Sequence, residues 1–373
     1  MREEKPHETA LSRRDLFRQI MNEPLPHEAG ADTGETVGDR LSQMGISRRG
    51  FMQFCAGMAS LMALPQSIVP VMAATLLAAK PSVIYQSFQE CTGCLESLVN
   101  TGAGSTTRPA STIENLLLNL ISLDYQETLM AAAGQQAEDL RNELIKTPGY
   151  VLVVDGSIPA NPNSGYFVSG GESGVARFKK VARNAGLIIT VGTCASFGGL
   201  PAAVDATGIS PTGALSIEQV LSDIRATDPT FPKTIPLINI SGCPPIAEVI
   251  TGTIVYFLTY KRVPPLDRLK RPTMFYGETV HEDCRREDYA EHGPYALSFD
   301  DSNARKGYCL LKLGCKGPVT HNACSRVKWN QGTSYPMHSG HGCIGCAEPG
   351  FWDHMNGAKK GFYVSLPPGS FDD

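Results

Sequence analysis

The sequence predicts an α/β protein, in which a doubly wound parallel sheet is followed by a smaller, irregular C-terminal domain. Two observations carry this prediction. Short β-branched runs alternate with helical patterns up to about residue 262, as strands and helices do around a parallel sheet. Beyond Val263-Pro264-Pro265, apolar runs become sparse while Gly, Pro, Cys and His become dense. We therefore expect a leader over residues 1–79, a sheet domain over 80–262 and a second domain over 263–373.

The composition fits a folded protein that holds metal or disulfides. At 373 residues the chain is long enough for two domains. Lys plus Arg is 33 and Asp plus Glu is 37, so the net charge of −4 gives no reason to expect nucleic-acid binding. The 11 cysteines are many for an intracellular enzyme, and they indicate either disulfides or metal ligands.

The N-terminal region is typical of a targeting segment. Residues 1–46 are polar and mixed in charge, and we expect them to be disordered. Ser47-Arg48-Arg49-Gly50-Phe51-Met52 then opens an uncharged stretch that ends in small residues at Ala79, which resembles a twin-arginine export signal. The stretch is also long enough for a membrane span, but Pro65 and Pro70 interrupt it and favour the signal.

In the sheet domain, apolar runs without alternation predict strands that are covered on both faces. These runs are 82–85, 150–154, 187–191 and 235–240. Helical patterns lie between them at Thr112–Ser122, at Gly174–Arg183 and from Ser216, where Gln219 follows at capping-box spacing. The run from Ile246 to Tyr260 is short for a membrane span and contains Glu248, so it indicates a buried helix.

Four cysteines follow three of these predicted strands. Cys91 and Cys94 follow the first strand as a CxxC pair, Cys194 follows the third and Cys243 the fourth. Because ligands of such sheets bind beyond the carboxyl ends of the strands, we expect the four thiols to meet at one edge, as four-iron cluster ligands do. Taken singly, the pair is also compatible with a redox dithiol or half of a zinc site, and Cys194 or Cys243 with a buried core residue.

The second domain carries six further cysteines. His281 and Cys284 have HxxC spacing, Cys343 and Cys346 have CxxC spacing, and Cys309, Cys315 and Cys324 lie between them. Three disulfides would use all six in an exported protein. Together with His281 and the first four thiols, however, they make eleven ligands, a number that divides into clusters as four, four and three.

Other residues of this domain have more ordinary interpretations. His338 and His341 stand beside the last pair and are candidates for tuning a cluster, while Lys328-Trp329-Asn330 either covers a cluster or docks a partner. We expect the remaining histidines of the domain to lie on the surface: His292, His321 and His354.

Seven motifs together resemble the small subunit of a NiFe-hydrogenase over about residues 81–355: ECTGCLES, GTCASFGG, SGCPP, HEDC, GYCLLKLGCKGP, NACSRVKWNQG and YPMHSGHGCIGC. The resemblance implies a flavodoxin-like first domain, two 4Fe-4S clusters and one 3Fe-4S cluster. The implied ligands are Cys91, Cys94, Cys194 and Cys243 for the proximal four-iron cluster, His281, Cys284, Cys309 and Cys315 for the distal four-iron cluster, and Cys324, Cys343 and Cys346 for the medial three-iron cluster. Pro336 stands where relatives with a four-iron medial cluster carry a further cysteine.

The same resemblance implies an uptake-type electron-transfer subunit without catalytic residues of its own. Electrons would come from hydrogen oxidation at the nickel-iron site of a large subunit and pass through the clusters to a cytochrome or quinone-linked acceptor. We expect a periplasmic heterodimer, or a dimer of heterodimers, that meets the membrane only through another subunit, because no apolar helix follows Val364. Gly93 and Gly199 stand where oxygen-tolerant members carry extra cysteines, which implies an ordinary proximal cluster and an oxygen-sensitive enzyme.

Two other functions remain open from the residues. The related quinone-reducing subunit of respiratory complexes shares the first-domain fold, but it lacks the second cysteine-rich domain and the export signal. A secreted, disulfide-rich binding module would use the cysteines without redox work. Glu90 and Glu96, beside the first pair, are candidates for a proton relay or for contact with a partner, or are ordinary solvated carboxylates.

Overall fold

The centre of the protein is a five-stranded parallel sheet. The computed structural model describes residues 39, 41–42, 47–77, 80–101 and 121–353. The strands are β1 (Ser82–Ser87), β2 (Ser122–Tyr125), β3 (Val151–Asp155), β7 (Leu187–Val191) and β9 (Leu237–Ile240). Their order is β2-β1-β3-β7-β9 and every neighbouring pair is parallel, which is the flavodoxin-like order. The predicted α/β fold class is confirmed.

Four of these strands lie in the predicted apolar runs, whereas β2 was missed. It is a short edge strand with the polar residues Ser122 and Asp124, and the hydroxyls of Ser82 and Ser122 both donate to the Asp124 carboxylate. The helical pattern predicted over Thr112–Ser122 lies largely outside the described residues, and its last residue begins β2. An edge strand stabilised by polar side chains carries no apolar period for sequence analysis to detect.

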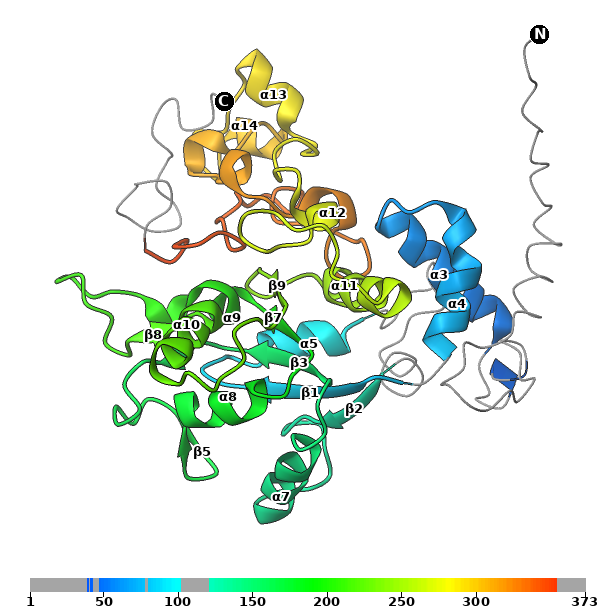
Figure 1. Cartoon of the computed structure of the whole chain (residues 1–373). Helices are drawn as coiled ribbons and strands as arrows, with labels where there is room; N and C mark the ends of the chain where they lie inside the picture. The colour runs from blue at the N-terminus through cyan, green and yellow to red at the C-terminus, as the bar shows by residue number, and fades with distance from the viewer. Residues whose placement is uncertain (1–38, 40, 43–46, 78–79, 102–120, 354–373) are drawn as a thin grey trace, which may run out of the picture.

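Helices cover both faces of the sheet (Figure 1). Val83 and Tyr85 of β1 belong to one core cluster with α5 (Gly93–Val99) and α11 (Ala247–Tyr260). Ile84, between them, belongs to a second cluster on the opposite face, with α7 (Gln135–Leu144), α8 (Gly174–Ala182) and α10 (Ile217–Thr227). Successive strand residues thus enter opposite cores, which explains the unbroken apolar runs.

Three of these helices confirm predictions from the sequence. The helix α8 occupies the predicted stretch from Gly174. The helix α10 begins with the expected capping box, in which the Ser216 hydroxyl accepts from the Gln219 amide at 3.3 Å and the Gln219 side chain accepts from the Ser216 amide at 2.9 Å. The helix α11 is buried along nearly its whole length. In the described part of the chain no helix is long and apolar enough to cross a bilayer.

Short elements lie around the carboxyl edge of the sheet. They are the helix α9 (Thr193–Phe197), the turn η3 (Leu200–Ala202), and two small antiparallel pairs, β4 (Ile158–Pro159) with β8 (Ala214–Leu215) and β5 (Val168–Ser169) with β6 (Glu172–Ser173). They belong to the loops that follow β3 and β7, and among them α9 contains Cys194 while β5 and β6 contact α8.

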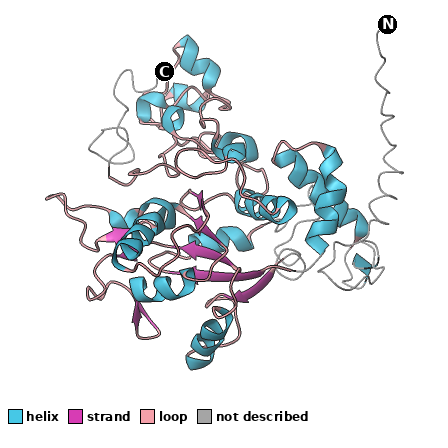
Figure 2. Cartoon of the chain, viewed as in Figure 1, coloured by secondary structure: helices cyan, strands magenta, loops and turns pink. Residues whose placement is uncertain are grey.

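The region after Tyr260 is mostly loop (Figure 2). Its helices have only four to six residues: α12 (Thr273–Tyr276), α13 (Glu287–His292), α14 (Ser302–Arg305) and α15 (Cys324–Val327), with the single turns η4 (Leu311–Leu313) and η5 (Gly317–Val319). A region with so little regular structure needs another source of stability, such as bound metal.

The segment that resembles an export signal forms a helical hairpin. It comprises α3 (Arg48–Leu61), the turn η1 (Gln66–Ile68) and α4 (Val69–Leu77), and it lies against α11 (Figure 1). Its apolar side chains belong to the same core cluster as α11 and the sheet.

Candidate metal centres

The structure brings the first four cysteines to the carboxyl edge of the sheet, as predicted. Cys94 lies in the first turn of α5 and Cys194 in α9, while Cys91 and Cys243 lie in the loops after β1 and β9. Burial, followed by the charge of Cys243, raises the pKa of Cys194 to about 12. Burial also raises the pKa of Cys243, to which the charge of Cys91 contributes. The four thiols thus lie near enough for their charges to affect one another, and together we call them the proximal set.

Two glycines let the backbone approach these thiols closely. Gly192 has φ +93° and an added Cβ would lie 2.4 Å from Cys94 Sγ. Gly199 has φ +63° and its Cβ would lie 2.5 Å from Cys194 Sγ. Gly93 is less constrained, since its Cβ would lie 3.3 Å from Cys91 Sγ. Any side chain at the first two positions would strain the backbone and displace sulfur.

Asp155 lies beside the proximal set and was missed from the sequence. It is 1% exposed, accepts a hydrogen bond of 3.2 Å from the Tyr85 hydroxyl and contacts Cys94, while its Oδ1 has no hydrogen-bond partner. Burial, followed by the charge of Glu90, raises the pKa of Asp155 to about 7. Asp155 is the last residue of β3. Ligands of parallel sheets bind beyond the carboxyl ends of the strands, so the reasoning that located the cysteines also applies to this carboxylate.

The two glutamates beside the CxxC pair differ in environment. Glu90 is half-buried, its pKa is raised by burial, and its Oε2 lacks a hydrogen-bond partner. Glu96 is exposed. Glu90 Oε1 accepts from the Thr92 hydroxyl at 3.5 Å, so only one carboxylate oxygen lacks a partner. Because an unpaired buried oxygen is costly, Glu90 is the better candidate for a functional contact.

Four residues predicted as ligands in the second domain line one cavity, and we call them the distal set: His281, Cys284, Cys309 and Cys315. The Tyr335 hydroxyl lies 3.8 Å from Cys284 Sγ, and the Arg286 amide lies 3.5 Å from the same sulfur. Burial raises the pKa of Cys315 to about 11. The HxxC pair and two cysteines some thirty residues further along the chain therefore meet, as the predicted grouping requires.

Cys324, Cys343 and Cys346 form the medial set. Burial raises the pKa of Cys324 and of Cys346 to about 12. The Trp329 side chain donates to Cys324, which favours the interpretation that Lys328-Trp329-Asn330 covers this set. The amide of Gly345 lies 3.4 Å from Cys343 Sγ.

Backbone amides join the three sets into one row. The amide of Cys243, in the proximal set, donates to the thiol of Cys346 in the medial set. The amide of Cys343, in the medial set, donates to Cys315 Sγ of the distal set at 3.2 Å. The sequence order of the cysteines does not reveal this spatial order, in which the medial set lies between the other two.

The donor set fits iron-sulfur clusters. All 11 cysteines are free thiols, and ten of them belong to the three sets. Within the described ranges no three His, Cys, Asp or Glu side chains converge on a point that one metal ion could occupy. Buried thiols with one histidine are suitable ligands for clusters of several irons.

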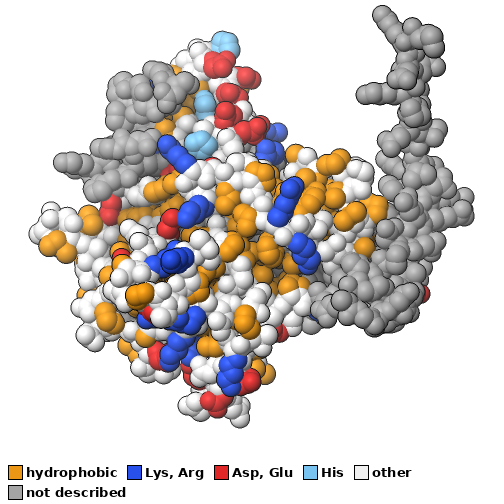
Figure 3. Space-filling view, in the orientation of Figure 1, with side chains coloured by type: hydrophobic (Ala, Val, Ile, Leu, Met, Phe, Trp, Pro, Cys, Tyr) orange, Lys and Arg blue, Asp and Glu red, His pale blue; other side chains and the backbone are white. Residues whose placement is uncertain are grey.

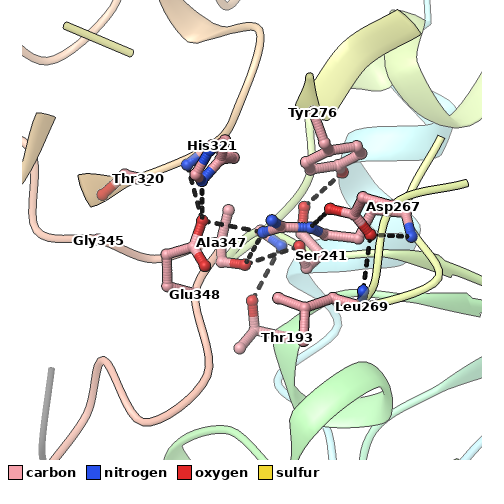
Figure 4. Close-up of polar contacts among 12 residues, drawn as sticks. Thr193, Ser241, Asp267, Leu269, Tyr276, Thr320, His321, Gly345, Ala347 and Glu348 are labelled. Carbon is pink, nitrogen blue, oxygen red and sulfur yellow. Dashed lines mark hydrogen bonds and ion pairs between the residues drawn. The ribbon is translucent and has the colours of Figure 1, made fainter. Parts of the chain in front are cut away.

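A buried ion-pair network ties the medial loop to the sheet (Figure 4). Arg271 is 2% exposed, and it donates to Asp267 Oδ2 at 2.8 Å, to Glu348 Oε1 at 2.9 Å and to the Ala347 carbonyl at 3.2 Å. The Ser241 hydroxyl, beyond β9, also donates to the Ala347 carbonyl, at 2.7 Å. This network fixes the chain next to Cys346 against the carboxyl edge of the sheet.

A second contact at the same junction comes from β7. Thr193 lies just beyond this strand, and its hydroxyl donates to the Cys346 carbonyl. The backbone amide of His321 donates to Glu348 Oε1 at 2.7 Å and so joins the network (Figure 4). The His321 side chain is 40% exposed, in agreement with the expected surface position. His354, grouped with it in that expectation, lies outside the described residues.

Pro336 is exposed, and its neighbours contact the distal set. Tyr335 reaches Cys284, and the Met337 carbonyl accepts from Arg286 Nε at 2.8 Å. His338 Nε2 lies 2.8 Å from Arg285 Nη1, and the His341 ring stacks on Phe299 with centroids 5.7 Å apart. The contacts described for these residues do not bring Pro336 to the medial thiols.

Comparison with known proteins explains this arrangement. Residues 276–358 match the C-terminal family model of the NiFe/NiFeSe hydrogenase small subunit, and residues 91–257 match that of the NADH ubiquinone oxidoreductase 20 kDa subunit. The chain is 42% identical to the uptake hydrogenase small subunit of Cupriavidus necator over 89% of its length and 86% of that protein. It belongs to the NiFe-hydrogenase small-subunit family. The hydrogenase-1 small chain of Escherichia coli is 40% identical, over 86% of this chain and 81% of the relative.

Solved hydrogenase structures share the fold. The NiFeSe hydrogenase of Desulfovibrio vulgaris matches with a TM-score of 0.65 and 32% identity, over 78% of this chain and 99% of that one. The Desulfomicrobium baculatum NiFeSe hydrogenase gives a TM-score of 0.65 at 30% identity, over 78% of this chain and all of that one. This small subunit is thus part of a hydrogen oxidoreductase whose catalytic site lies on the large subunit.

Proposed function

We propose that this protein carries electrons from hydrogen oxidation on its large subunit, through three iron-sulfur clusters, to a cytochrome or quinone-linked acceptor. The observation that supports this most strongly is the unbroken row of thiol sets, joined by the amide contacts Cys243 to Cys346 and Cys343 to Cys315. Bound clusters would supply one-electron redox chemistry, and the protein fixes their order and surroundings.

The proposed proximal ligands are Cys91, Cys94, Cys194 and Cys243, the distal ligands are His281, Cys284, Cys309 and Cys315, and the medial ligands are Cys324, Cys343 and Cys346. The proximal and distal sets have four ligands each, as four-iron clusters require, whereas the medial set has three. Pro336, which has no ligand atom, is consistent with a three-iron medial cluster. The neutral His281 replaces an anionic thiolate, which should raise the potential at the end of the row.

The distal end is suited to an electron exit. Acidic and histidine side chains gather on the surface over α13 (Figure 3), where Glu287 and Asp288 occupy the first turn. Cys284 lies three residues before this helix and is only partly buried. An acidic surface beside the last set would steer a basic acceptor toward it.

We further propose a periplasmic location, reached through the twin-arginine pathway, and a heterodimer with the large subunit or a dimer of such heterodimers. We also propose that any association with the membrane is made through another subunit. The domains proposed from the sequence, 80–262 and 263–373, agree with the change from regular elements to loop after Tyr260. Gly93 and Gly199, in place of further proximal cysteines, support an ordinary four-iron proximal cluster and an oxygen-sensitive enzyme.

The test is purification with the large subunit, followed by iron analysis and electron paramagnetic resonance. The expected content is about eleven irons for this protein, and the oxidised form should give a three-iron signal. Hydrogen-dependent dye reduction reports on the whole electron path. A protein without iron, whose thiols are blocked as disulfides, would instead support the binding-module function.

Pro336→Cys tests the medial assignment separately. Addition of a thiolate at this position should convert the three-iron signal toward that of a four-iron cluster, whereas Pro336→Ala, which adds no ligand, should leave the spectrum unchanged. An identical spectrum for the two variants would contradict the placement of Pro336 at the medial cluster.

A further inference from the structure

The hairpin α3–α4 is folded into the core, although its sequence resembles an export signal. Phe51, Phe54, Cys55, Met58 and Met62 of the α3 region are at most 6% exposed, and Met72, Ala73 and Leu76 of α4 are at most 2% exposed. These side chains belong to the core cluster that includes α11 and the sheet. A signal that its receptor binds as an extended, free segment has no requirement for these side chains to be buried against the rest of the protein.

The α3 helix has the two-sided pattern of a packed helix. Its buried residues recur at helical spacing, and Gln53, Gly57 and Ser60 form the opposite, more accessible face. The hairpin also has its own local order. The Ser47 hydroxyl accepts from the Gly50 amide at 3.3 Å at the start of α3, and Gln66 Nε2 donates to Ser60 Oγ at 3.0 Å across the turn.

The receiving surface is one side of α11. Gly252 lies where the hairpin approaches, because a Cβ added there would lie 2.8 Å from the Phe275 ring and 3.9 Å from Leu61. The polar residues of α11 do not oppose apolar packing, since the hydroxyls of Thr253 and Thr259 donate to carbonyls of their own helix at 2.8 and 2.7 Å. The helix therefore offers an apolar surface on which these two hydroxyls are satisfied.

Docking hides part of the twin-arginine pattern. Phe51 is 4% exposed and the Ser47 hydroxyl is engaged as a helix cap, while the Arg49 side chain remains exposed. We propose that α11 is the docking site of the α3–α4 hairpin in the unprocessed chain, and that this docking withholds the export signal. The second half of this proposal rests on the export pathway proposed for this chain, whereas the first half does not.

The two states of the hairpin exclude each other. A receptor that binds Phe51 and the apolar residues after it must first remove them from α11, so its apparent affinity falls by the fraction of chains in which the hairpin is docked. Conversely, any change that weakens the docking increases presentation of the signal. Docking and export are therefore linked through one surface of α11.

Cys55 reports on docking directly. It is fully buried in the hairpin and is the single cysteine outside the three ligand sets. In the unprocessed protein, purified with its clusters and large subunit, alkylation of Cys55 followed by peptide mass spectrometry should be at least about tenfold slower than in the denatured chain. Alkylation at the rate of the denatured chain would overturn the docking.

A matched pair of variants identifies the face that docks. Phe54→Asp places a charge on the buried face and should expose Cys55, whereas Gln53→Asp places the same charge on the adjacent exposed position and should keep Cys55 protected. Equal protection in the two variants would contradict the burial of this face against α11.

The first export variant changes α11 and leaves the signal itself unchanged, and its control lies on the accessible face of α3. Gly252→Leu adds a side chain against Phe275 and Leu61 and should release the hairpin, whereas Gly57→Leu adds the same side chain where nothing lies within 4 Å. The first variant should reach the periplasm faster and the second should not. If Gly252→Leu speeds alkylation of Cys55 but not export, docking does not withhold the export signal. If export is unchanged when Arg48 and Arg49 are both replaced by Lys, the proposed export pathway is wrong, while the docking of the hairpin on α11 still stands.

Discussion

At Gly199, the backbone lies so close to Cys194 that even the methyl group of an alanine would meet the proximal thiols. Gly199→Ala should cost about 1–2 kcal/mol in backbone strain at φ +63° and should also displace Cys194 Sγ, which lies 2.5 Å from the new Cβ. We expect reduced proximal-cluster occupancy, measured as iron content and as the signal of the reduced protein.

Gly208 provides the control for this substitution. Its φ is +84°, but an added Cβ meets nothing within 4 Å. Gly208→Ala should therefore lower stability by a similar amount of backbone strain and leave the iron content unchanged. If both variants lost iron equally, the effect would come from strain and not from the contact with Cys194.

Glu138 is the second residue for which the structure makes a specific prediction. Its carboxylate lies 2.9 Å from Arg177 Nη1 and 2.8 Å from Arg141 Nη2, and both arginines are 1% exposed. Glu138→Gln leaves two buried guanidiniums short of negative charge and should lower the free energy of unfolding by about 3–5 kcal/mol. Glu143→Gln, on the exposed side of the same helix, should change it by less than about 1 kcal/mol, as measured by denaturant unfolding.

The same residue predicts a pH dependence. Burial opposes ionisation of Glu138, but the hydrogen bond and charge of Arg177, together with Arg141 and Lys180, outweigh it and lower the pKa. A lowered pKa means that the stabilisation is complete above the unfolded value of about 4.3 and is lost as the pH falls through the folded value. Below about pH 4.3, the free energy of unfolding should therefore fall more steeply with decreasing pH for the unaltered protein than for Glu138→Gln. Parallel curves would exclude this role.

At the scale of elements, the Arg271 network determines how the loop of Cys346 sits on the strand ends. Arg271 uses two nitrogens, with Nε donating to Asp267 and Nη1 donating to Glu348 and the Ala347 carbonyl. The single terminal nitrogen of lysine does not reproduce this planar, two-nitrogen geometry. Arg271→Lys should broaden or shift the signal of the proposed medial three-iron cluster while leaving the iron content close to normal. Arg268→Lys, a matched change three residues earlier in the chain, serves as the control, and a spectral change common to both would remove the network as the cause.

The strands and the grouping of the first four cysteines could be predicted from the sequence, whereas the Arg271 network could not. Runs such as Leu187–Val191 were located to the residue, because a strand covered on both faces must be apolar throughout. The meeting of Cys91, Cys94, Cys194 and Cys243 followed from one rule about strand ends. The Arg271 network was not predictable, since Arg271 and Glu348 meet only after segments far apart in the chain have packed, and neither residue stands in a local pattern.

The hairpin marks the other limit of prediction from sequence. An uncharged apolar stretch after two arginines has the same composition whether it is threaded through a membrane or packed on α11. What distinguishes the packed form is the accessible row of Gln53, Gly57 and Ser60, which is weak because two of the three residues are small.

At the scale of the whole molecule, the two domains should respond differently to loss of metal. The sheet domain has five strands between two apolar clusters, whereas in the described part beyond residue 260 no helix exceeds six residues. Chelation should therefore abolish hydrogen-exchange protection over residues 276–353 and preserve it in β1, β3, β7 and β9. Equal loss in both domains would mean that the sheet also depends on bound metal.

The burial of the thiols has a consequence for the chain before any metal arrives. Cys194, Cys315, Cys324 and Cys346 have pKa values raised to between about 11 and 12, so at neutral pH each keeps its proton. A protonated thiol is a poor nucleophile and exchanges slowly with disulfides and oxidants. Of these four thiols, only Cys194 lies in the sheet domain, which should stay folded without metal. For this proposed ligand the fold therefore favours the reduced thiol before any iron is bound.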